Sequence, residues 1–165
     1  IVLADSDLSD LSVDFARNMA AKPDIKPFVI ESMYRPVEGD RICYSYKAPT
    51  DLWDRMTGAI ADGGAHLILT TGQKTNSTWG TQTLERKLSE EFPDKSILRV
   101  DSQTIADPNH PAFGAMSGDI DALLNAYDLV ICSPTIESGV SIDLKGHFSA
   151  VWCWATGMQA ENSVR

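Results

Sequence analysis

The sequence predicts an α/β fold in three layers, with a doubly wound, mainly parallel sheet between two layers of helices. Short apolar segments alternate with amphipathic segments of helical length, which is typical of β-α-β units. The segment 128–133 has an uninterrupted apolar centre, as strands buried on both faces do. The chain has 165 residues, 43% of them apolar, and this size fits one soluble domain with a substantial core better than two.

Apolar periodicity places the elements in order along the chain. The predicted strands cover 2–4, 26–32, 41–46, 66–70, 96–100, 128–133 and 150–155. The predicted helices cover 11–21, 51–61, 80–92 and a segment from 117 or 118 to 127. In the first helix, Leu11, Phe15 and Met19 are four residues apart and define an apolar face. The abrupt chain ends lead us to expect a piece of a longer protein.

Several residues mark the helix ends. Ser9 or Asp10 is expected to cap the first helix, and Thr50 the second, because their side-chain oxygens can accept backbone N–H groups. The pair Gly63-Gly64 closes the second helix, and Pro93 stops the third.

Charge and cysteine content restrict the possible functions. The net charge is −9, from 14 Lys and Arg against 23 Asp and Glu, so the domain alone lacks the overall basic character of most nucleic-acid binders. Cys43, Cys132 and Cys153 form no CxxC pair or zinc pattern, and two of them lie in predicted core strands. We therefore expect a reducing, cytoplasmic setting. No apolar run approaches the ~20 residues that cross a membrane.

The segment Asp5-Ser6-Asp7-Leu8-Ser9-Asp10 is the first candidate site, because three carboxylates follow a strand. Such a group can hold Mg²⁺ or supply a nucleophile, and the DxD pattern resembles haloacid-dehalogenase-like phosphatases. That family also needs a Ser or Thr at the end of a later strand, and an acidic pair after another. Asp119 and Asp121 instead precede a helix. The alternatives are a simple helix cap and a helicase-type motif.

A polar turn at 70–75, Thr-Thr-Gly-Gln-Lys-Thr, is the second candidate site. It lies between a strand and a helix, where a phosphate-binding loop belongs, but Gln73 occupies the place of the glycine that a Walker A loop requires before its lysine. The alternatives are a structural turn and a turn whose hydroxyls and amides bind a nucleic-acid phosphate.

The third and most specific candidate site is the loop at 132–143, Cys-Ser-Pro-Thr-Ile-Glu-Ser-Gly-Val-Ser-Ile-Asp, which follows the buried strand. Gly139 allows a phosphate to approach the backbone closely, and Thr135 and Ser141 offer hydroxyls. So many small polar groups after so apolar a strand favour a functional loop over a purely structural one.

This loop resembles motif V of superfamily-two helicases, in the form found in plasmid-replication and origin-binding helicases. The segment 2–9 is similar to the motif III strand of that group, and 67–73 (Leu-Ile-Leu-Thr-Thr-Gly-Gln) to motif IV. Residues 158–165 would lead toward motif VI. The resemblance implies that 1–36 end a first motor domain and that 37–165 form the second RecA-like domain, truncated before motif VI.

The resemblance also implies roles for individual residues. Backbone phosphates of single-stranded DNA would contact Thr70, Thr71, Gln73, Ser133 and Thr135. Gly139 and Ser141 would line the ATP side of the cleft, and Asp5 and Asp7 would couple the two sites. ATP and Mg²⁺ would bind only in the intact protein, together with an upstream motor domain that carries the Walker A loop. We expect the fragment alone to be inactive, with no resident metal and no membrane contact. Two alternatives stay open: a magnesium-dependent phosphatase that uses Asp5 and Asp7, and a non-catalytic α/β interaction domain.

Aromatic and histidine residues favour structural roles. Trp152 and Trp154 alternate along the last strand, which predicts that both pack on one face of the sheet. Trp79 lies in the polar loop before a helix, where it can pack at the helix start or stack on a base. The three histidines are far apart in the sequence and form no ligand pattern.

Overall fold

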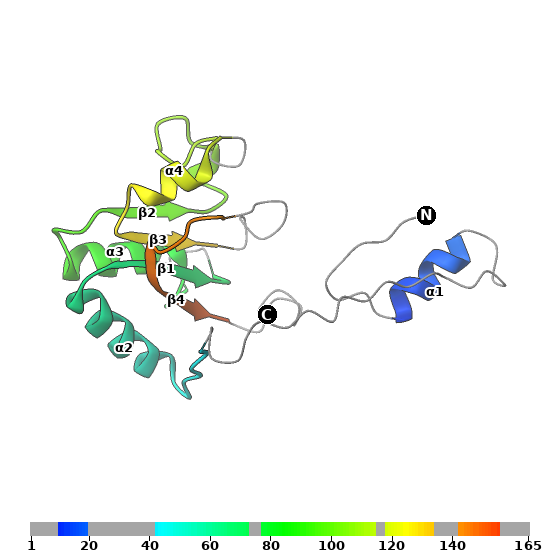
Figure 1. The fold of residues 1–165 in the computed structure, drawn as a ribbon, viewed down its shortest axis with the longest axis horizontal. Helices are drawn as coiled ribbons and strands as arrows, with labels where there is room; N and C mark the ends of the chain where they lie inside the picture. The colour runs from blue at the N-terminus through cyan, green and yellow to red at the C-terminus, as the bar shows by residue number, and fades with distance from the viewer. Residues whose placement is uncertain (1–9, 20–41, 73–76, 115–117, 134–141, 156–165) are drawn as a thin grey trace. The chain divides into compact units, whose positions relative to one another are not determined.

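The computed structural model describes residues 10–19, 42–72, 77–114, 118–133 and 142–155. The chain divides into two compact units, Ile1–Ser45 and Tyr46–Arg165. In the first unit the described helix is α1 (Asp10–Met19), close to the predicted 11–21 (Figure 1). Of its predicted apolar face, Phe15 is 65% and Met19 67% exposed. The predicted strands at 2–4 and 26–32 lie outside the described residues.

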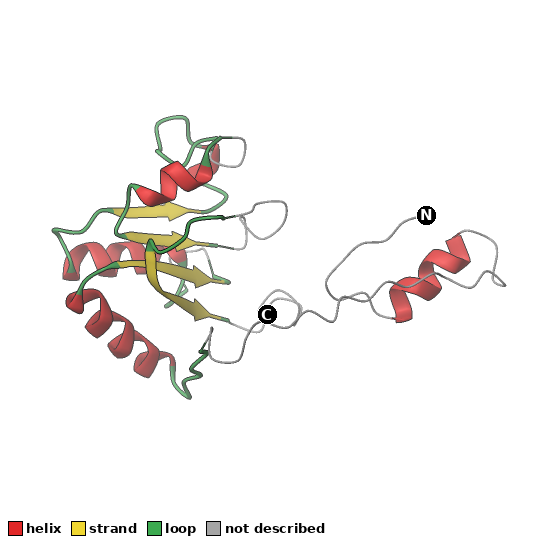
Figure 2. Ribbon diagram, viewed as in Figure 1, coloured by secondary structure: helices red, strands yellow, loops and turns green. Residues whose placement is uncertain are grey.

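The second unit holds a four-stranded parallel sheet and its helices (Figures 1 and 2). The strand order is β2-β3-β1-β4, and each pair of neighbours is parallel. This confirms an α/β fold with a parallel sheet. The elements are α2 (Pro49–Asp62), β1 (Ala65–Thr70), α3 (Thr81–Glu91), β2 (Ile97–Val100), the 3-10 turn η1 (Thr104–Ala106), α4 (Ile120–Asn125), β3 (Leu129–Cys132) and β4 (Phe148–Trp154).

Helices cover both faces of the sheet. Alternate residues of each strand point to opposite sides, so each strand contributes side chains to both cores. On one face, Met56 and Ile60 of α2 and Leu84 and Leu88 of α3 pack against β1, β3 and β4. On the other face, Leu124 of α4 packs against β1, β2 and β3. Trp152 and Trp154 belong to the α2/α3 face and are 9% and 4% exposed, which confirms their predicted place in the core.

The strand order sends the connections of two neighbouring strands in opposite directions. The chain leaves β1 toward β2 through α3, whereas it leaves β3 toward β4, on the other side of β1. The carboxyl ends of the adjacent strands β1 and β3 therefore carry loops that run in opposite directions. Open α/β sheets bind their ligands in the crevice outside such a switch point.

Three local predictions are wrong. Residues 42–46 form no strand, and Ile42 and Tyr44 are 69% and 72% exposed; their alternating pattern meets no partner strand among the described residues. Thr50 does not cap α2, because Ala48 occupies the N-cap and Pro49 follows it. Helix α4 begins later than 117 or 118, after an Asp119 N-cap whose side chain accepts from the Ala122 N–H at 3.0 Å.

The structure also shows the conformation of the glycines after α2 and the exposure of the cysteines. Gly63 and Gly64 close α2 as predicted, both with positive φ. The cysteines are all free, and Cys132 is buried while Cys43 and Cys153 are exposed, so β4 presents its cysteine outward. Among the described helices, none has the length and the apolar character needed to cross a membrane.

Candidate functional site

The carboxyl end of β1 forms a tightly bonded turn. Thr70 is 3% exposed, and its hydroxyl donates to the carbonyl of Trp79 and accepts from the N–H of Gly72 at 3.2 Å. The Thr71 N–H donates to the Trp154 carbonyl at 3.2 Å, so this turn is also tied to the end of β4. Thr70 is thus a residue that shapes the turn, while half-buried Thr71 lies nearer to solvent.

The start of α3 returns to the same turn. The Thr81 N–H donates to the Gly72 carbonyl at 3.0 Å, and the Ser77 carbonyl accepts from the Gly80 N–H at 3.2 Å. A Cβ at position 72 would lie 2.7 Å from the Ser77 hydroxyl oxygen, so glycine permits this close approach. The structure describes the β1–α3 loop at its two ends, residues 71–72 and 77–80, and these hydrogen bonds hold the two ends close together.

The carboxyl end of β3 lies beside the end of β1. Leu69 and Cys132 are partners in the parallel register, so Thr70 and Ser133 follow paired positions. Ser133 is 5% exposed, and its N–H donates to the Val100 carbonyl of β2 at 3.0 Å. Two of the segments that the sequence singled out thus begin next to each other at one edge of the sheet.

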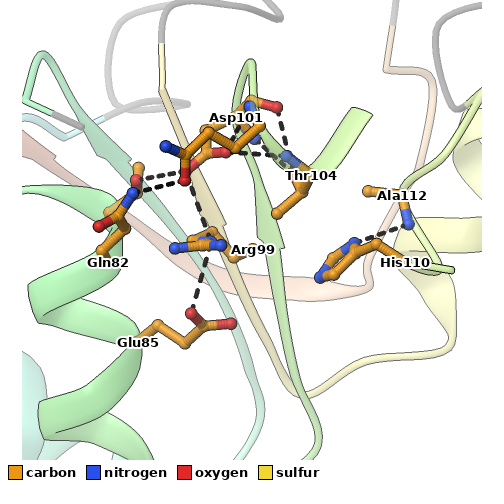
Figure 3. A network of polar contacts seen from close by, with 9 residues as sticks. Gln82, Glu85, Arg99, Asp101, Thr104, His110 and Ala112 are labelled. Carbon is orange, nitrogen blue, oxygen red and sulfur yellow. Dashed lines mark hydrogen bonds and ion pairs between the residues drawn. The ribbon is translucent and has the colours of Figure 1, made fainter. Parts of the chain in front are cut away.

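Asp101 directly follows β2 and is the residue at this edge that our sequence analysis missed (Figure 3). Its carboxylate is fully buried and accepts from the Thr81 hydroxyl at 2.7 Å and from the N–H groups of Gln103 and Thr104 at 3.0 and 3.1 Å. Arg99 Nε lies 3.4 Å from Asp101 Oδ2 and 3.4 Å from Glu85 Oε2, as ion pairs without hydrogen-bond geometry.

This arrangement limits the chemistry available to Asp101. Both of its oxygens already accept protein donors, so the carboxylate gives no support to a role as a phosphatase ligand or nucleophile. The signal in the sequence was a carboxylate placed directly after a strand, but its burial depends on Thr81, twenty residues away in the chain.

The aromatic residues beside the edge pack against one another. The rings of Trp79 and Trp154 stack at 5.6 Å and 13°, and Trp53 lies 5.9 Å from Trp79. The Lys87 ammonium lies 4.5 Å from the centre of the Trp79 ring, a favourable cation–π distance. The packing interpretation of Trp79 is therefore confirmed. We call Trp53, Trp79 and Trp154 the tryptophan cluster.

Cys132 and the three histidines occupy structural positions. Burial raises the pKa of the Cys132 thiol to about 12, so this thiol stays protonated and is no nucleophile. His66 accepts from the Trp152 indole N–H at 3.3 Å, His110 accepts from the Ala112 N–H at 3.1 Å (Figure 3), and His147 donates to the Tyr127 carbonyl at 3.2 Å. In the part of the chain that the structure describes, no three His, Cys, Asp or Glu side chains are placed to hold a metal ion.

Three of the predicted site residues are described, and the structure brings them to one edge: Thr70, Thr71 and Ser133. The other predicted site residues lie outside the described ranges: Asp5, Asp7, Gln73, Thr135, Gly139 and Ser141.

Comparison with known proteins gives one informative match. The chain is 41% identical over 162 residues to an uncharacterized protein of Picosynechococcus sp., and the match covers 96% of this chain. It covers 16% of that protein, so the chain spans about a sixth of the length of this relative. No protein-family model matches the chain. No solved structure matches it either.

Proposed function

We propose that residues 37–165 are the second RecA-like domain of an ATP-dependent helicase of the plasmid-replication or origin-binding type, and that 1–36 end the preceding motor domain. The site of this unit would contact the backbone of single-stranded DNA. ATP and Mg²⁺ would bind in the intact protein, between this domain and an upstream domain with a Walker A loop. The chain by itself would not hydrolyse ATP.

One observation carries the proposal: β1 and β3 are adjacent and parallel, and their carboxyl ends carry the segments that resemble motifs IV and V. Loops at such an edge can present backbone N–H groups and hydroxyls to one ligand. Thr71 and Ser133 begin these two segments, and Thr70 shapes the first of them. Asp5 and Asp7 remain the proposed coupling residues, Gly139 and Ser141 the ATP-side residues, and Gln73 and Thr135 further phosphate contacts.

Charge predicts how the interaction behaves. With a net charge of −9, the chain lacks the excess of Lys and Arg that gives nucleic-acid binders their affinity. We expect weak binding with a shallow dependence on salt, because the slope grows with the number of phosphates that Lys and Arg neutralise. Neutral hydrogen-bond donors on the protein would orient the DNA strand more than they would increase the affinity for it.

The test is a fluorescence-anisotropy titration of a labelled oligothymidylate with the full chain at low salt. Thr78 is exposed on the β1–α3 loop, and Ser89 is exposed near the other end of α3, so they form a matched pair. We expect Thr78→Asp to weaken binding about three- to tenfold and Thr78→Lys to strengthen it, because the added charge faces the phosphates. Ser89→Asp should leave the affinity unchanged. Equal effects at the two positions would contradict a site at this edge.

A second assay separates the proposal from its enzymatic alternative. Hydrolysis of an aryl phosphate with Mg²⁺ that disappears in Asp5→Asn would replace the helicase proposal with the phosphatase. Absence of both turnover and DNA binding would favour the non-catalytic interaction domain.

A further inference from the structure

The start of α3 is fixed to the end of β2 by a buried polar network rather than by apolar packing alone (Figure 3). Thr81 and Asp101 are both fully buried, and the Thr81 hydroxyl donates to Asp101 Oδ2 at 2.7 Å. A second link joins the next residue of α3 to the same turn, since Gln82 Nε2 donates to Gln103 Oε1 at 2.7 Å. The first turn of α3 is thus held by side chains that follow β2.

The end of β2 is itself rigidly shaped. The Asp101 N–H donates to the Thr104 hydroxyl at 2.8 Å, and that hydroxyl donates back to the Asp101 carbonyl at 3.1 Å. The carboxylate closes the same turn through the N–H groups of Gln103 and Thr104. Arg99, on the same face of β2, balances the buried charge and contacts Glu85 of α3. Asp101 therefore has one fixed position from which it holds Thr81.

Hydrogen bonds therefore fix the β1–α3 loop at both of its ends. At the first end, Thr70 bonds to Gly72 and to the Trp79 carbonyl. At the second end, Thr81 bonds through its N–H to the Gly72 carbonyl and through its hydroxyl to Asp101. Trp79, two residues before Thr81, stacks on Trp154. Thr81 is thus bonded to both sides of the loop, and it lies two residues from a member of the tryptophan cluster.

We propose that Asp101 and Thr81 are positioning residues, which set the described ends of the β1–α3 loop, residues 71–72 and 77–80, in the geometry that contacts a single-stranded nucleic acid. This inference rests on the proposed function for its ligand, but the loop geometry itself can be measured without any ligand. Neither residue contacts the nucleic acid, since both are fully buried. Asp101 acts through Thr81, and Thr81 acts through the loop.

The test uses two substitutions at one position in the full chain. Thr81→Val keeps the shape of the side chain but removes the hydroxyl and leaves a buried carboxylate with one donor fewer. Thr81→Ser keeps the hydroxyl. We expect Thr81→Val to alter the near-ultraviolet circular dichroism of the tryptophan cluster and to weaken oligothymidylate binding about tenfold, the equivalent of one hydrogen bond. Thr81→Ser should restore the spectrum and bring the affinity within about twofold of wild type.

A control variant distinguishes a change in loop geometry from a general loss of stability. Leu124→Ala destabilises the opposite face of the sheet, so it should lower the melting temperature without changing the spectrum or the affinity. All measurements are made at a temperature where each variant is folded. If Thr81→Val keeps the wild-type spectrum, the positioning inference is overturned, whether or not DNA binds. If the spectrum changes but wild type binds no oligonucleotide, the proposed function fails instead. Binding by wild type and Thr81→Val with equal affinity also overturns the inference.

Discussion

His66 shows how a single buried side chain can make the fold sensitive to pH. It lies in β1 at 2% exposure, its Nε2 donates to the Gly63 carbonyl at 3.3 Å, and its Nδ1 accepts from Trp152. These partners require the neutral ring, and burial lowers the pKa of His66 below its usual 6.5. The unfolded chain therefore takes up a proton that the folded chain resists.

We predict that His66 stabilises the fold fully above about pH 6.5 and that this contribution is lost as the pH falls through its lowered pKa. In His66→Asn, the amide oxygen keeps an acceptor for Trp152 but does not titrate. The variant should be less stable by about 1–2 kcal/mol near neutral pH, and the difference from wild type should shrink as the pH falls below about 6.5. Urea denaturation at several pH values measures this. A difference that stays constant with pH would show that the ring does not titrate in this range.

Sequence reasoning identified some residues of the core and missed others for a physical reason. The alternation of Trp152 and Trp154 predicts their shared face, since period two needs no knowledge of the partner strands. Asp101 could not be assigned in the same way. A carboxylate becomes a buried acceptor only when distant donors such as Thr81 are brought to it, and that requires the fold.

Helix ends are the element-scale feature on which sequence and structure differ most clearly. Thr50 has the side chain of an N-cap, but it lies within α2, whose N-cap is Ala48. The sequence drew attention to Asp119 only as half of an acidic pair, yet it caps α4.

We therefore predict opposite results for two alanine substitutions. Asp119→Ala should cost about 1 kcal/mol, because it removes an acceptor of a helix N–H, whereas Thr50→Ala should change stability by less than about 0.5 kcal/mol. Urea denaturation midpoints compare the two variants directly. A larger loss in Thr50→Ala would contradict the assignment of the caps.

Two glycines near α2 give a second pair of opposite predictions. Gly58 lies within the helix with nothing within 4 Å of an added Cβ, so Gly58→Ala should stabilise the fold by about 0.5–1 kcal/mol. Gly64 has a φ of +88°, and an added Cβ would clash with the Ser149 hydroxyl oxygen, so Gly64→Ala should cost about 1–3 kcal/mol. Thermal unfolding of both variants checks the signs. Equal shifts would show that backbone conformation does not limit position 64.

Element boundaries were predictable where apolar patterns are long and ended by a strong signal. Gly63-Gly64 closes α2 as expected, and β1 and β3 lie within a residue of their predicted places at each end. The segment 42–46 failed because alternation shows only that a strand is possible. A strand also needs a neighbour that supplies its hydrogen bonds.

At the scale of the whole molecule, the alternation of elements predicted a parallel α/β sheet but could not give the strand order. That order decides which loops meet, and it places the ends of β1 and β3 together. The motifs suggest what the loops bind, and the sheet brings two of the loops to one edge.

The most direct measurement is an NMR titration of the isotopically labelled chain with an oligothymidylate at low salt. We expect the amide shifts to concentrate at the carboxyl edge, at Thr71, Gly72 and Ser133. We expect little change at the amino edge, at Gly64 and Asp128. Shifts concentrated at the amino edge, or no shifts at any salt concentration, would contradict a nucleic-acid interface at the ends of β1 and β3.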